Sequence, residues 1–160
     1  MLSMTGHFLY YYKIPLGSLG FIENNDALTH VLFSNSVIPE GAVIQETPLI
    51  KQAFIEVMEY LNNGREVFDL PLAPKGTPFQ EKVWQVLQTI PYGQTITYQE
   101  LARRVGKPTA LRGVGMACHY NPLPILIPCH RVIGKNRDIT GYVAGSDLKR
   151  YLLDLESNMG

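Results

Sequence analysis

The stretch that decides the fold is residues 97–120, which read TYQELARRVGKPTALRGVGMACHY. Thr97 with Glu100 three residues later predicts a capping box, opening a short helix from Tyr98 to Val105 that stops at Gly106. A further helix is predicted from Lys107-Pro108-Thr109 to about Tyr120. Two short helices joined by a turn with glycine are typical of a helix-turn-helix, although an ordinary pair of core helices gives the same pattern.

Helices and turns flank this stretch on both sides. Upstream, a helix is predicted to start at Thr77 or Pro78 and end before Pro91, with these side chains facing inward: Phe79, Val83, Trp84, Val86 and Leu87. Downstream, the prolines of residues 121–124 break the helix, and the apolar residues 125–127 lead into Cys129. Ser146 or Asp147 is predicted to cap a last helix that ends near Glu156.

The first third of the chain reads as strands. Aromatic and β-branched runs at residues 7–14, 19–23 and 27–33 are separated by turn residues, which predicts a three-stranded antiparallel meander. Pro48 opens a helix to about Leu61, stopped by Asn62-Asn63-Gly64, with one apolar stripe: Ile50, Phe54, Val57, Met58 and Leu61. Residues 71–78 hold three prolines and a glycine, so two domains are expected, 1–74 and 75–160.

Charge divides along the same line. Residues 1–74 carry three basic and eight acidic residues, and residues 75–160 carry eleven basic and six acidic ones, so the net charges are −5 and +5. Within the basic half, Arg103, Arg104, Lys107 and Arg112 form a candidate phosphate-facing patch, although a basic run is often only a solvated face. With 46% apolar residues the chain can bury a core, and no apolar run reaches the roughly 18–20 residues of a membrane span. Without a secretory leader pattern and with two cysteines, it is expected to be cytoplasmic, with reduced thiols.

Cys129 is the candidate nucleophile, in the run Ile127-Pro128-Cys129-His130-Arg131-Val132. A working cysteine needs a base or a cation, because its thiol has a pKa of about 8.5 and only the thiolate attacks. His130 is adjacent, and Glu156 is a candidate to orient it. A buried structural cysteine is the plainer alternative.

The same residues allow two other kinds of site, a metal site and a cysteine hydrolase. Cys118-His119 and Cys129-His130 offer zinc-ligand types, but their spacing is not that of a structural zinc site. A cysteine hydrolase is the other alternative, but that function does not explain the helix-turn-helix predicted immediately before the cysteine. Neither metal nor cofactor is expected.

Residues 121–134, NPLPILIPCHRVIG, closely resemble the acceptor site of the O6-alkylguanine-DNA alkyltransferases. The resemblance runs from about Thr77 to Glu156 and includes FQEKVW at 79–84, PYG at 91–93, TYQELA at 97–102 and RGVG at 112–115. It implies an α+β protein: an N-terminal three-stranded antiparallel sheet with a helix, ribonuclease-H-like, and a C-terminal winged-helix-like domain with the helix-turn-helix. It also implies transfer of an alkyl group from O6-alkylguanine, and from O4-alkylthymine, to Cys129 in one irreversible turnover.

The resemblance implies a role for each matching residue. Cys129 accepts the alkyl group, His130 and Glu156 relay its proton through a water, Tyr98 protonates guanine N3, and Asn121 ties the recognition helix to the cysteine loop. The partner is double-stranded DNA carrying O6-alkylguanine, bound through the minor groove by a monomer, and no membrane is involved. Arg112 enters the base stack, and the other DNA-binding residues are Thr97, Gln99, Ala110, Leu111, Gly113 and Gly115.

The alkyl pocket is expected to be lined by Cys118, Pro124, Val132, Tyr142, Val143 and Ala144. After Tyr142 the family usually has a small residue and two glycines, whereas this chain reads Val143-Ala144-Gly145. Together with Thr140, Val143 and Ala144 are predicted to narrow the pocket and to disfavour benzyl against methyl and ethyl groups. Relatives with zinc hold it on N-terminal cysteines, and this chain has no cysteine before Cys118.

Two further functions compete with the single-turnover transferase. A non-catalytic sensor of alkylated bases would keep Tyr98, Arg112 and the helix-turn-helix but has no use for the acceptor Cys129. A regulator signalling through methylated Cys129 needs a further DNA-binding or effector domain, which 160 residues do not accommodate.

Overall fold

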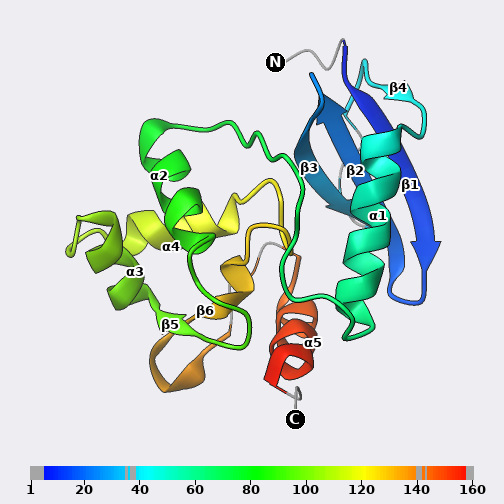
Figure 1. Ribbon diagram of the computed structural model, residues 1–160. Coiled ribbons are helices and arrows are strands. Elements are labelled where there is room, and N and C mark those ends of the chain that lie inside the picture. Colours follow the sequence, from blue (N-terminus) through cyan, green and yellow to red (C-terminus); the bar gives the residue numbers. More distant parts are fainter. Residues whose placement is uncertain (1–5, 35, 37–38, 140–141, 143, 158–160) are drawn as a thin grey trace. The chain divides into compact units, whose positions relative to one another are not determined.

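The computed structural model describes residues 6–34, 36, 39–139, 142 and 144–157. The chain forms two compact units, residues 1–74 and 75–160 (Figure 1). Among the described residues, no helix combines the length and the apolar character needed to cross a membrane.

The first unit is built on a sheet in the order β3-β2-β1-β4. Strands β1 (Phe8–Ile14), β2 (Gly17–Asn24) and β3 (Ala27–Phe33) form the predicted antiparallel meander. Asn25 and Asp26 both have positive φ, which suits the mirror-image turn of a two-residue hairpin. The prediction of three strands was one short, because β4 (Val43–Ile44) pairs in parallel with β1. Strand β4 has only two residues, and both are exposed, so it has no alternation of buried and exposed side chains from which the sequence could predict it.

Helix α1 (Pro48–Leu61) packs on this sheet and contacts all three long strands (Figure 1). Its predicted bounds are confirmed, and the Thr47 hydroxyl caps it by accepting the Ile50 N–H at 3.1 Å. The predicted apolar stripe was partly wrong, because the buried centre is formed by Ile50, Ala53, Glu56, Val57 and Tyr60. Phe54 lies at the margin instead, where its ring stacks on Tyr12 at 3.9 Å.

The second unit holds four α-helices among its described residues, together with a small sheet. The helices are α2 (Pro78–Leu87), α3 (Tyr98–Val105), α4 (Leu111–His119) and α5 (Ser146–Ser157). Strands β5 (Ile96–Thr97) and β6 (Val132–Ile133) pair in parallel, and the 3-10 turns η1 (Cys129–Arg131) and η2 (Lys135–Arg137) flank β6. The register sets Ile96 beside Val132 and Thr97 beside Ile133. The start of α3 therefore lies beside the segment that follows the cysteine.

Helices α3 and α4 form the helix-turn-helix. Gly106 ends α3 in the left-handed conformation with φ of 88°, as its position predicts. The start of α4 was predicted too early: residues 107–110 form a turn, in which the Ala110 N–H donates to the Lys107 carbonyl, and the helix begins at Leu111. The capping box at Thr97 is half formed, because the Glu100 carboxylate binds Arg103 and Arg104 instead of returning to the Thr97 N–H. The complete box in this unit caps α2, between Thr77 and Gln80.

Helix α4 is held against α2 at two points. The indole N–H of Trp84 donates to the Ala117 carbonyl at 2.8 Å. A Cβ built on Gly113 would meet ring carbons of Phe79 at 3.2 and 3.3 Å, so the missing side chain makes room for α2. The core of the second unit thereby fixes which face of α4 points outward.

Candidate active site

Cys129 lies in the turn η1, directly before β6, and its side chain is buried. The apolar run before it is also buried, but it forms a tight turn, in which Ile125 has a φ of 74°. A β-branched residue rarely adopts this left-handed conformation, so the turn is locally strained and must be held by its surroundings. The loop therefore presents the sulfur from a fixed backbone.

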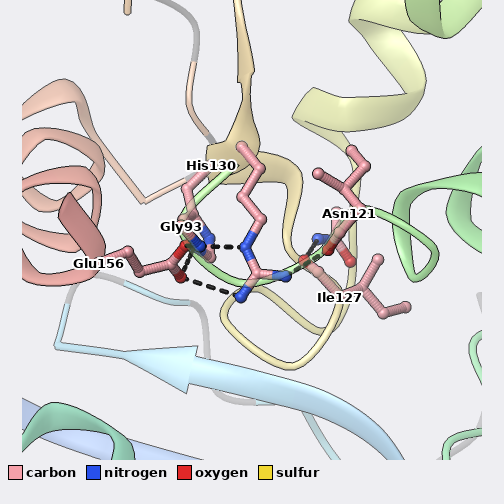
Figure 2. Close-up of polar contacts among 7 residues, drawn as sticks. Gly93, Asn121, Ile127, His130 and Glu156 are labelled. Atoms are coloured by element: carbon pink, nitrogen blue, oxygen red, sulfur yellow. Dashed lines mark hydrogen bonds and ion pairs between the residues drawn. The ribbon is translucent and has the colours of Figure 1, made fainter. Parts of the chain in front are cut away.

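Asn121, at the end of α4, holds this loop. Its side-chain amide donates to the Ile127 carbonyl at 2.9 Å and to Cys129 Sγ at 3.1 Å, and its carbonyl oxygen accepts the Leu123 N–H at 2.9 Å. Figure 2 shows Asn121 and Ile127 near each other. All three bonds are buried, so each is costly to leave unmade. The structure thus joins the end of α4 to the cysteine through one side chain.

Burial controls the protonation of Cys129. Loss of water raises the pKa of its thiol to about 11, although the hydrogen bond from Asn121 and the charge of Lys149 lower it. At neutral pH the resting group is a thiol, and a base is needed to remove its proton.

That base lies next to it, on a fixed carboxylate. His130 Nε2 donates to Glu156 Oε2 at 2.7 Å, and Glu156 also accepts the Gly93 N–H and two bonds from Arg131 at 2.9 and 3.0 Å. Figure 2 shows Glu156 reaching from α5 toward His130 and Gly93. A carboxylate held by a guanidinium and a backbone N–H keeps its charge, so the imidazole must be the donor in their shared bond. Nδ1 is then the basic nitrogen of His130.

His130 is neutral in this setting. Its side chain is fully buried, and burial lowers its pKa against the opposing effect of Glu156. A neutral imidazole with a fixed tautomer is the form that can accept a proton from a thiol. The predicted grouping of Cys129, His130, Glu156 and Asn121 is what the structure brings together.

Tyr98 is the first residue of α3 and lies half-buried beside this group. Burial raises the pKa of its hydroxyl, and the nearby Cys118, Cys129 and Asp138 raise it further. It is therefore a proton donor at neutral pH and not a phenolate.

Three of the seven residues predicted to meet DNA lie on the outer face of α4. Arg112 and Leu111 are exposed, and a Cβ on Gly115 would meet nothing within 4 Å. Thr97 and Gln99 are exposed at the start of α3, and Ala110 is half-buried before α4. Gly113 is half-buried, and a Cβ built on it would meet the Phe79 ring, so its lack of a side chain also serves the packing of α2 against α4. Within the basic patch, Arg103 and Arg104 are already paired with Glu100.

Two family models match the chain. Residues 8–74 match the ribonuclease-like domain, and residues 78–158 the DNA-binding domain, of 6-O-methylguanine DNA methyltransferase. The chain belongs to this methyltransferase family.

Similar proteins support the assignment over nine-tenths or more of the chain. The constitutive methylated-DNA–protein-cysteine methyltransferase of Bacillus subtilis is 45% identical over 152 residues, which are 90% of this chain and 92% of that protein. The Mycobacterium bovis protein of the same name is 50% identical over 146 residues, covering 90% and 88%. The crystal structure of Mycobacterium tuberculosis OGT in complex with DNA has a TM-score of 0.87 at 36% identity and covers 94% of this chain and 92% of that one.

The residues expected to line the alkyl pocket of this methyltransferase are mostly buried. Cys118, Pro124, Val132 and Tyr142 are buried and Ala144 is half-buried. Val143 and Thr140 lie outside the described residues. Burial raises the pKa of the Cys118 thiol, and a nearby Cys129 charge raises it further, so Cys118 is the less acidic of the two cysteines.

Two buried residues that contact the site, Arg131 and Lys149, were not among the site residues predicted from the sequence. Arg131, whose Nη1 also donates to the Ile90 carbonyl at 2.6 Å, was noted only as a neighbour of His130. Lys149, on α5, is buried and donates to the Val132 carbonyl at 2.6 Å. The one signal for Lys149 is its spacing of seven residues, two helical turns, from Glu156. Most lysines at such positions point to solvent, so this signal is weak.

In the described part of the chain, no group of three or more His, Cys, Asp or Glu side chains could hold a metal ion. Cys118 is buried while its neighbour His119 is exposed, so the two side chains point apart.

Proposed function

We propose that this methyltransferase repairs DNA by moving the alkyl group of O6-alkylguanine to Sγ of Cys129. The observation that carries the proposal is the buried thiol held by Asn121, next to a neutral histidine fixed on Glu156. The names of relatives that match over nine-tenths of the chain give the same activity. A purely structural cysteine has no need of the adjacent base.

The chemistry balances as an in-line displacement. The thiol proton passes, through a water, to His130 Nδ1, and the sulfur attacks the alkyl carbon. The carbon–sulfur bond forms as the carbon–oxygen bond breaks, and the electron pair goes to the guanine ring. Tyr98 supplies a proton to N3, which avoids release of a guanine anion. The product thioether resists hydrolysis, so each protein acts once and irreversibly, on O6-alkylguanine and on O4-alkylthymine.

The substrate base must leave the helix to reach a buried sulfur. Extruding a nucleotide costs a few kcal/mol and leaves a gap in the stack. Arg112 on the outer face of α4 is proposed to fill that gap from the minor groove, where Gly115 permits close approach. Thr97, Gln99, Ala110 and Leu111 are proposed to contact the same strand region.

Selectivity for guanine is proposed to come from the backbone of the cysteine loop. The carbonyls of Cys129 and Val132 would accept from the guanine amino group. The Val132 carbonyl already accepts from Lys149, but a carbonyl oxygen has two lone pairs and can accept a second bond. We further propose that the protein acts as a monomer, without cofactor, in the cytoplasm, where thiols stay reduced.

The test is intact mass measurement after mixing the protein with duplex DNA that carries O6-methylguanine. One methyl mass is expected per protein, lost in Cys129→Ser, and peptide mapping should find it on Cys129 and not on Cys118. Binding of the lesion without any gain of mass would support the non-catalytic sensor and contradict the transferase.

A further inference from the structure

Lys149 is a buried charge that the proposed mechanism does not use. It lies in the first turn of α5 with a side chain that is 1% exposed. Its Nζ donates to the Val132 carbonyl at 2.6 Å and lies 5.8 Å from the centre of the Tyr98 ring. Its charge also interacts with Cys129, Cys118 and Asp138. The residues around it thus include the thiol acceptor and the tyrosine.

Two physical costs oppose a lysine at this position. Removing an ammonium from water is unfavourable unless it is paired, and a cation near a helix N-terminus meets the positive end of the helix dipole. Burial accordingly lowers the pKa of Lys149, while Cys129, Cys118 and Asp138 oppose that effect. A position that costs this much needs a compensating negative charge close by.

The other charges near Cys129 are already matched. Arg131 is bound by Glu156 through two hydrogen bonds, and His130 is neutral at rest. When the thiol proton passes to His130, the sulfur becomes negatively charged beside an imidazolium, and Lys149 supplies a second positive charge that acts on Cys129. Helix α5 therefore contributes two side chains to the cysteine site. Glu156 binds His130, and Lys149, two turns earlier on the same buried face of α5, binds the Val132 carbonyl of β6.

We propose that Lys149 is a positioning residue, which stabilises the Cys129 thiolate through its charge and orients the Val132 carbonyl through its hydrogen bond. It stays protonated throughout: the proton from Sγ goes to His130, and the charge on sulfur is lost when the carbon–sulfur bond forms. The inference rests on Cys129 as the acceptor.

The test compares neutral and charged replacements of Lys149. Lys149→Met and Lys149→Gln remove the charge, Gln keeps an N–H donor, and Lys149→Arg keeps the charge. Leu152→Ala is the matched control, because Leu152 is buried on the same face of α5 and carries no charge. Single-turnover methyl transfer from O6-methylguanine in duplex DNA is followed by mass from about pH 6.5 to 10. Methylation of Cys129 by iodomethane, without DNA, is followed over the same range.

Both neutral variants are expected to react at least about tenfold more slowly at pH 7.5, since one unit of thiol pKa is tenfold in thiolate. The ratio of the wild-type rate to the rate of either neutral variant should decrease as pH rises through the lowered pKa of Lys149, because the ammonium then loses its charge. Lys149→Arg should recover most of the rate, and Leu152→Ala should show a ratio to wild type that is constant with pH.

The proposal would be overturned if Lys149→Met and Lys149→Gln reacted as fast as wild type. It would also be overturned if their rates relative to wild type did not change with pH, as expected for Leu152→Ala. Failure of the proposed function looks different: wild type would gain no methyl from DNA. The iodomethane arm still measures the effect of Lys149 on Cys129 in that case.

Discussion

At the scale of single residues, Asn121 links three parts of the site. Its amide binds the Cys129 sulfur and the Ile127 carbonyl, and its oxygen binds the Leu123 N–H, all within a strained turn. A short polar side chain thereby replaces the regular hydrogen bonds that an irregular buried loop lacks. The same residue also favours the thiolate over the thiol, because its bond to sulfur strengthens with negative charge.

We predict that Asn121→Ala lowers the free energy of unfolding by about 2–4 kcal/mol, because three buried bonds are lost and their partners stay buried. Methyl transfer should slow by roughly tenfold or more as the thiol loses its donor. Urea unfolding and single-turnover rates measure the two effects. Asn121→Asp, which keeps the acceptor for Leu123 but adds a negative charge beside the sulfur, should slow transfer more than Asn121→Ala. Transfer at wild-type rate in both variants would contradict the role of Asn121.

Two histidines shielded from water, one buried (His130) and one half-buried (His30), predict how stability depends on pH. Burial lowers the folded-state pKa of His130 and of His30, so near pH 6 the unfolded chain binds more protons than the folded one. The stability that these two groups contribute is therefore present above the ordinary histidine pKa of about 6.5 and is lost as pH falls toward the folded values.

We accordingly expect the free energy of unfolding to fall between about pH 7 and 5, as measured by urea titration. The fall should become shallower in His130→Gln and in His30→Gln, and shallowest in the double variant. His119→Gln, at an exposed histidine, serves as the control for the loss of one imidazole.

At the scale of elements, α4 has two glycines with opposite surroundings. A Cβ on Gly113 meets the Phe79 ring, whereas a Cβ on Gly115 meets open space. The inner glycine thus lets α2 and α4 pack, and the outer one leaves the exposed face of the helix flat. Gly115 has no packing purpose within the described structure, and glycine in a helix interior costs up to about 1 kcal/mol relative to alanine.

We predict that Gly115→Ala raises the free energy of unfolding by roughly 0.5–1 kcal/mol and weakens binding to duplex DNA, because the new methyl group stands on the proposed contact face. Gly113→Ala gains the same helix propensity but must displace Phe79, so it should be less stable than Gly115→Ala. It should also weaken DNA binding less than Gly115→Ala does. Urea unfolding measures the stability of both variants, and fluorescence anisotropy with duplex DNA measures their affinity. Equal effects on DNA binding would contradict the assignment of the two faces.

At the scale of the whole molecule, charge is divided between two units of net −5 and +5. The neutral total therefore says little about DNA, because a phosphate backbone responds to the local charge of the surface that it meets. Pairing of Arg103 and Arg104 with Glu100 reduces that local charge, and the same pairing lowers the pKa of Glu100 to about 2.

The whole-molecule prediction uses two exposed lysines, one in each unit. Lys107→Ala, in the turn before α4, should weaken DNA binding and reduce the slope of log affinity against log salt concentration by about 0.9, as expected for one lost phosphate contact. Lys51→Ala makes the same change in total charge from α1 and should leave the slope unchanged. Titrations between about 50 and 200 mM salt measure both variants. Equal losses of DNA affinity and of salt slope in the two variants would mean that DNA binding depends only on the net charge of the protein.

The sequence by itself determined the elements with local signals. Pro48 and Asn62 bounded α1, Thr97 and Gly106 bounded α3, and the run through Cys129 and His130 marked the reactive group. Capping, turn residues and nucleophile-base neighbours act over a few positions, so one sequence reveals them. For the same reason the two-residue β4 and the delayed start of α4 were missed, since neither has a local pattern.

Only the tertiary structure decided how distant side chains share charge and space. The two bonds from Arg131 to Glu156, the bond from Lys149 to the Val132 carbonyl and the approach of Phe79 to Gly113 join residues 17 to 34 positions apart. Whether a lysine is solvated or buried, and whether a glycine faces a groove or a ring, depends on what packs against it. Burial sets the desolvation cost, and that cost determines which of these groups can take part in the chemistry at Cys129.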